Sequence, residues 1–160
     1  MVQRFPNKCF KMPKDNAINE ITLRKYEKPY STDKRQLVKK ICLSLGLLQP
    51  GDGRDIIVDI LMVLIEEQKK KNKLDSEEIR KKVEVVRKNH NLELKGLAES
   101  NIRRQLKRLR DLMIIEKNNN LYHLTEFESL HEIFNNKIQK FIIDPSIQRI
   151  NDYLSELEKQ

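Results

Sequence analysis

Apolar residues recur at spacings of three and four along four segments of the chain, which is the period of one face of an α-helix. The sequence therefore predicts helices over about residues 33–45, 55–70, 76–88 and 100–113. The second of these is apolar nearly all round in its first ten residues. Because such a helix cannot expose a polar face there, we expect it to be central and packed on several sides.

A hairpin is expected directly after the fourth helix. Two short apolar runs, 114–115 and 121–124, flank a stretch of asparagines at 118–120. Asparagine tolerates the positive φ angles that tight hairpin turns require. The pattern therefore predicts a fold that is mainly α with one small β-hairpin.

The C-terminal region 126–160 carries two further apolar stripes. Phe127, Leu130, Phe134, Ile138 and Phe141 indicate a helix over about 126–142, which Asp144 and Pro145 should break before a second helix begins. The second stripe consists of Ile147, Ile150, Leu154 and Leu157, with Tyr153 at its edge. These five residues are candidates for a homodimer interface, and the alternative is that the helix folds back on its own domain.

Charge divides the chain into regions. The net charge is +8, with 32 Lys+Arg against 24 Asp+Glu. Residues 1–50 carry an excess of basic residues, 98–125 a smaller one, and 126–160 an excess of acidic ones. A basic chain favours a polyanionic partner, although lysine- and glutamate-rich sequences also serve stability in thermophiles. We interpret 1–31 as a basic N-terminal arm with one short strand near 21–24.

The helix at 100–113 places its charges opposite its apolar stripe. On a wheel of about 100° per residue, Ile102, Leu106, Leu109 and Met113 share one side. The candidate nucleic-acid-binding residues are the basic side chains opposite, the short polar groups near the helix start, and one lysine in the hairpin: Arg103, Arg104, Lys107, Arg108, Ser100, Asn101, Gln105 and Lys117. Arginine can pair with guanine or hold phosphates.

The order of elements and the residues at 106–125 carry a family resemblance. Leu106, Leu109, Asp111 and the run 112–116 are followed by asparagines and then by residues 121–125. Here the chain resembles the winged helix-turn-helix superfamily, especially small prokaryotic and archaeal transcriptional regulators, over about residues 55–125. The resemblance implies a winged helix at 32–125, flanked by the N-terminal arm and the C-terminal helices, whose basic helix enters the major groove of double-stranded DNA.

Two other functions remain open from the residues. Some winged helices bind proteins, so the chain could be an interaction subunit of transcription, replication or RNA-processing machinery. RNA binding through the basic arm is the third possibility. The pattern identifies neither a DNA target sequence nor a small-molecule effector.

Enzymatic and membrane roles find no support in the residue pattern. The histidines His90, His123 and His131 lack metal-ligand spacing, so we expect no enzyme, no metal and no cofactor. Cys9 and Cys42 do not suggest a disulfide framework, which favours a reducing compartment. The first ten residues lack an apolar signal segment and no apolar run could span a bilayer, so we expect a cytoplasmic protein.

Overall fold

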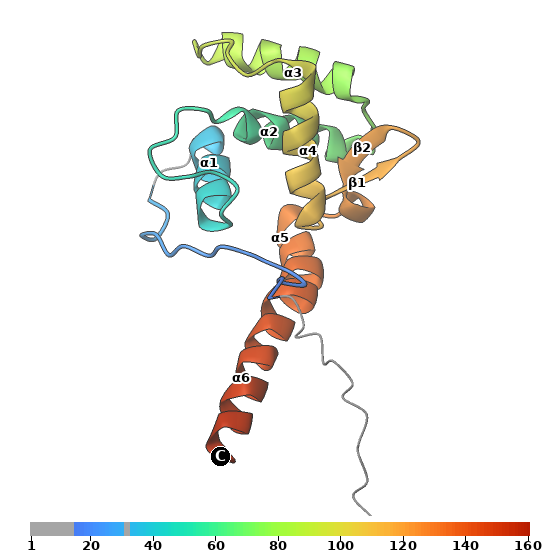
Figure 1. The fold of residues 1–160 in the computed structure, drawn as a ribbon. Coiled ribbons are helices and arrows are strands. Elements are labelled where there is room, and N and C mark those ends of the chain that lie inside the picture. The colour runs from blue at the N-terminus through green and yellow to red at the C-terminus, as the bar shows by residue number, and fades with distance from the viewer. Residues whose placement is uncertain (1–14, 31–32) are drawn as a thin grey trace, which may run out of the picture.

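The computed structural model describes residues 15–30 and 33–160 (Figure 1). The four predicted helices are confirmed as α1 (Lys34–Ser44), α2 (Ile56–Lys69), α3 (Ser76–Asn89) and α4 (Glu99–Asp111). Side chains cap two of them: Asp33 accepts from the Gln36 N–H at the start of α1, and Asp75 forms a capping box with Glu78 at the start of α3. The chain is thus mainly helical where apolar periodicity indicated it.

The small sheet is the predicted hairpin. Strands β1 (Ile115–Asn118) and β2 (Leu121–Leu124) pair antiparallel. The two-residue turn between them, Asn119 and Asn120, has φ angles of 50° and 61°. Both are in the left-handed region, which asparagine tolerates better than most residues. One residue between α2 and α3 joins the sheet: Leu74 exchanges two backbone hydrogen bonds with Tyr122, at 3.0 and 2.7 Å.

Helix α2 lies at the centre of the fold, as its all-round apolar sequence predicts. It contacts α1, α3, α4 and β2. Its fully buried side chains include Ile57, Val58, Ile60, Leu61 and Leu64. These four elements are therefore fixed relative to one another chiefly through α2.

Four buried charges connect the first three helices. Arg35 of α1 and Arg87 of α3 both bind Asp55 and Asp59, which lie one turn apart at the start of α2. Arg35 Nη2 is 2.9 Å from Asp55 Oδ2, and Arg87 Nη1 is 3.0 Å from Asp55 Oδ1. None of the four side chains is more than 10% exposed. Each charge is thus paired and hydrogen-bonded, the condition under which buried charges are tolerated.

The buried network predicts a stability difference at acid pH. Burial alone would raise the pKa of Asp55, but hydrogen bonds from Arg35 and Arg87 outweigh it and hold that pKa below its ordinary 3.8. The resulting stability is present above pH 3.8 and is lost as the pH falls toward the folded value. We expect the melting temperatures of wild type and Asp55→Asn, followed from neutral pH downward, to converge in this acid range. A difference in melting temperature between the two proteins that stays constant as the pH falls would contradict this role of Asp55.

The visible part of the N-terminal arm docks beside α1 without forming the strand predicted near 21–24. The Arg24 N–H donates to the Ser44 carbonyl at 2.9 Å. Its guanidinium donates to the carbonyls of Leu43 and Leu48, at 3.1 and 3.3 Å, and to Gln49 Oε1 at 2.9 Å. Lys40 of α1 adds contacts to Glu27 and to the Tyr26 ring, so several residues hold the arm against α1. Residues 1–14 and 31–32 of the predicted arm lie outside the described residues.

The C-terminal prediction was wrong about the helix break. After a short 3₁₀ turn (Thr125–Phe127), α5 (Leu130–Ile133), a π-helical segment (Phe134–Ile143) and α6 (Asp144–Glu158) follow without interruption. Asp144 has helical φ and ψ angles of −61° and −44°. Pro145 lies in the first turn of α6, the part of a helix in which proline is tolerated.

The π-helical segment also changes which side chains face the core. Ile133, Ile138 and Ile142 are buried, at spacings of five and four. Phe141, expected on the inner stripe, is 48% exposed. Beyond this segment α6 projects away from the rest of the fold (Figure 1) and has no buried residue. The fold-back alternative is therefore not what the structure shows.

Candidate nucleic-acid interface

Helix α4 is anchored along one side and open along the other. Ile102, Leu106 and Leu109 are each 0% exposed, and the helix contacts α2, α3 and β1. Because these contacts cover three turns of one face, the position of α4 is fixed by the core. Its outer side chains are consequently displayed on a rigid support.

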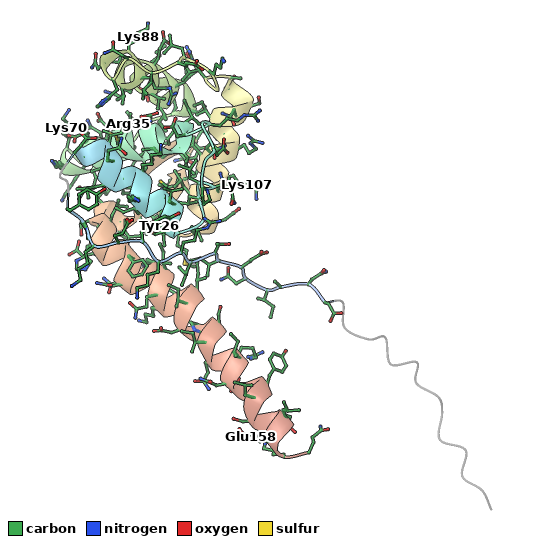
Figure 2. The ribbon with its side chains drawn as sticks, turned by 90° about the vertical axis from the view of Figure 1, so that its left-hand side faces the viewer. Tyr26, Arg35, Lys70, Lys88, Lys107 and Glu158 are labelled. Atoms are coloured by element: carbon green, nitrogen blue, oxygen red, sulfur yellow. The ribbon has the colours of Figure 1, made fainter. Side chains whose placement is uncertain are left out.

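The exposed face of α4 carries four cations, three of which the sequence predicted. Arg103, Arg104, Lys107 and Arg110 are all exposed, and Lys107 points outward from the helix (Figure 2). Arg110 was missing from the predicted set, although on the wheel it lies about 20° from Arg103. The basic surface of α4 is therefore these four residues.

Local acids pair with two of the four cations of this basic surface. Arg103 lies 2.7 Å from Glu99 and Lys107 lies 3.1 Å from Asp111, both one turn apart along the helix. Exposed pairs of this kind contribute little free energy, in the range of about 0.3–0.5 kcal/mol. A phosphate can therefore replace either carboxylate at small cost.

Arg108 and Gln105 have different positions from those predicted. Gln105 is 8% exposed, and its Oε1 accepts from Arg108 Nη1 at 2.8 Å. Arg108 is half-buried, and its Nη2 lies 3.5 Å from the Gly46 carbonyl. The two side chains brace α4 against the turn after α1. The helical wheel indicates the burial of Gln105. Leu112 is buried and lies at about 280° from Ile102, so the core side of the helix extends to that angle and includes Gln105.

The start of α4 is fastened to the loop before it. The Asn101 side-chain amide donates to the Gly96 carbonyl at 2.7 Å, and its Oδ1 accepts from Arg104 at 2.8 Å. Arg87 of α3 also binds this loop, since its Nε donates to the Glu93 carbonyl at 2.6 Å. Asn101 thus positions the loop and Arg104, while Ser100 remains exposed in the first turn of the helix.

The hairpin contributes one cation. Lys117 of β1 is exposed, and its Nζ lies 5.7 Å from the centroid of the Tyr122 ring. The turn beyond it contains only asparagines. The tip of the hairpin therefore offers hydrogen-bonding groups and little charge.

The histidines and acids do not form a second centre in the part of the chain that the structure describes. His123 is buried, not a surface residue, and stacks on the Phe127 ring with centroids 4.2 Å apart. Residues 15–30 and 33–160 contain no group of three or more His, Cys, Asp or Glu side chains arranged to hold a metal ion. Within the same residues, every helix is too short or too polar to cross a membrane.

Comparison with known proteins adds no relative to this picture. No protein-family model, no curated protein and no solved structure matches the chain. The interpretation of the basic surface of α4 therefore depends on the geometry and charge of the chain itself.

Proposed function

We propose that the chain is a winged helix-turn-helix protein that binds double-stranded DNA through α4 and acts as a transcriptional regulator. The order of elements supports the winged-helix assignment: α2, the single strand residue Leu74, α3, α4 and then the hairpin. This is the order of a winged helix-turn-helix over residues 56–124, with the hairpin as the wing. Helix α1 and the C-terminal helices are additions to it.

One observation carries the proposal of DNA binding. Four cations occupy the outer face of a helix whose opposite face is completely buried. A single helix can enter the major groove, where arginine pairs with guanine and both arginine and lysine bind phosphates. Arg103, Arg104 and Lys107 lie on the middle of the exposed face, and Ser100 lies near the helix start, where such helices contact base edges.

The double variant Arg104→Ala/Lys107→Ala tests this function. We expect it to weaken binding to duplex DNA about ten-fold or more and to reduce the dependence of affinity on salt by about two counterions. Fluorescence polarisation with labelled duplex at several salt concentrations measures both quantities. An affinity and salt slope equal to those of wild type would refute the role of α4.

A matched control removes two other exposed cations. Lys69 and Lys70 lie at the end of α2, and Lys70 is on the opposite side from Lys107 in Figure 2. Lys69→Ala/Lys70→Ala changes net charge by the same amount. We expect it to leave most of the affinity intact, and an equal loss in both variants would indicate that net charge alone attracts DNA.

The exposed apolar face of α6 favours a second function, in which the chain is an interaction subunit of transcription, replication or RNA-processing machinery. In that case duplex DNA should not bind even at low salt. Competition of structured RNA against duplex DNA in the same titration separates RNA binding from the proposed function.

A further inference from the structure

An apolar seam begins at half-buried Ile143, which packs against the core, and continues along α6, where its residues are exposed. Ile143, Ile147, Ile150, Leu154 and Leu157 follow one another at spacings of four, three, four and three. The last four are 53%, 59%, 52% and 71% exposed. This spacing is the heptad pattern of a coiled coil, with the residues at alternating a and d positions.

The π-helical segment links the seam to the domain. It contains ten residues, Phe134–Ile143, and buries Ile138 and Ile142 against the domain. Because a π-helix turns less per residue than an α-helix, the apolar positions that follow it are rotated relative to the domain. Beyond this segment no residue of α6 is buried, so the seam is exposed together with the rest of the helix. The seam projects beyond the domain, near the end that Glu158 marks in Figure 2.

We propose that this seam pairs with the α6 seam of a second copy of the chain, in parallel, to form a two-stranded coiled coil. A heptad seam is self-complementary, since each a or d side chain packs into a hole made by the same residue types on the partner. A two-fold axis along the helices brings each apolar position against its own copy. No additional protein is needed to cover the face.

The polar residues that flank the seam favour the parallel arrangement. In a parallel pair, Ser146 would face Asn151 of the other copy and Tyr153 would face Glu158, so no like charges meet. In an antiparallel pair that matches the same apolar residues, Asp144 would face Glu158 at both ends, and like charges on facing positions are unfavourable.

The size of the seam sets the expected strength of pairing. Helix α6 has 15 residues, which is about 22 Å or two heptads. Two such helices bury on the order of 1,000 Å², at the lower limit for a specific interface. We therefore expect a dimer in the micromolar range, with both basic α4 helices at the same end of the coil.

Sedimentation equilibrium of the full chain tests the pairing without nucleic acid, so its outcome is independent of the proposed function. From about 5 to about 200 µM we expect a shift from monomer to dimer by mass action. Ile150→Glu/Leu154→Glu should remain monomeric throughout. Because α6 has no buried residue, this variant should keep the melting temperature of the domain. A monomeric wild type, a larger oligomer, or a variant that still dimerises would each overturn the proposal.

A matched variant controls for added charge. Gln148→Glu/Ser155→Glu introduces two carboxylates at exposed positions of the same helix, outside the seam. We expect this variant to dimerise nearly as well as wild type. If it too is monomeric, charge on α6 and not the seam governs association, and the proposed interface is wrong.

A cross-link tests the orientation. In a parallel pair, Leu157→Cys places two thiols at facing d positions, so mild oxidation should give a covalent dimer. In the antiparallel pair residue 157 faces residue 147, and the two cysteines are about 15 Å apart along the axis, beyond disulfide reach. The variant also carries Cys9→Ser, which removes one of the two native thiols. The other, Cys42, is fully buried, and burial raises the pKa of its thiol to about 12, so it does not take part in the cross-linking reaction. A dimer that does not cross-link would overturn the parallel arrangement.

Discussion

Asp59→Ala is expected to lower the free energy of unfolding by about 3–5 kcal/mol. Asp59 is 0% exposed and accepts hydrogen bonds from both Arg35 and Arg87. Without it, two buried guanidinium groups share the single carboxylate of Asp55. Urea denaturation followed by circular dichroism measures the loss, because the domain is helical and its unfolding changes the signal strongly.

An exposed aspartate provides the control. Asp152 of α6 pairs with Arg149 at 3.2 Å, but both side chains are more than half exposed. Asp152→Ala should therefore cost less than about 1 kcal/mol. If Asp59→Ala also lowers the free energy of unfolding by less than about 1 kcal/mol, the buried arginines form hydrogen bonds with water or other acceptors in the variant. The network would then not be what fixes α1 and α3 to α2.

The same network shows what apolar periodicity can and cannot predict. The pattern identified α2 as central because its apolar residues surround the helix, and the structure confirms this. Within that pattern Asp59 is a single acidic residue. Periodicity records which positions are buried and not which side chains meet, so the partners on α1 and α3 could not be identified. A lone acid in a buried run nevertheless requires a cationic partner.

For the basic helix α4, the sequence correctly predicted the cations at the middle of the exposed face but misplaced Arg108 at its edge. Arg103, Arg104 and Lys107 are exposed as expected, because they lie farthest from the apolar stripe. Arg108 lies at the boundary, where the neighbouring turn after α1 decides burial. That turn belongs to a distant segment of sequence, so the contact of Arg108 with the Gly46 carbonyl depends on tertiary packing that the wheel does not contain.

The C-terminal helices were misplaced for a different reason. The prediction assumed 3.6 residues per turn and a helix break at Pro145. The π-helical segment has a longer period, so Ile133, Ile138 and Ile142 take the inner positions at spacings of five and four. Apolar residues at 134, 138 and 141 fit the ordinary period equally well, and the sequence alone does not distinguish the two.

Gly46→Ala is expected to destabilise the chain by about 2–5 kcal/mol and to displace the N-terminal arm. Gly46 has a φ of +70°, and a Cβ added to it would lie 2.6 Å from Thr22 Cβ and 3.1 Å from the Thr22 carbonyl oxygen. The left-handed backbone costs about 1–2 kcal/mol for a residue with a side chain, and the steric clash with the arm adds about 1–3 kcal/mol. Thermal denaturation measures the stability, and limited proteolysis within residues 15–30 measures release of the arm.

Gly51 separates the two causes. Its φ is +78°, but a Cβ there would meet nothing within 4 Å. Gly51→Ala should therefore show only the backbone cost of about 1–2 kcal/mol and leave the arm protected from proteolysis. Equal losses in the two variants would mean that Thr22 does not press on Gly46. A larger loss confined to Gly46→Ala, together with faster cleavage of the arm, is expected because the Arg24 hydrogen bonds to Ser44 and Leu43 require this close approach.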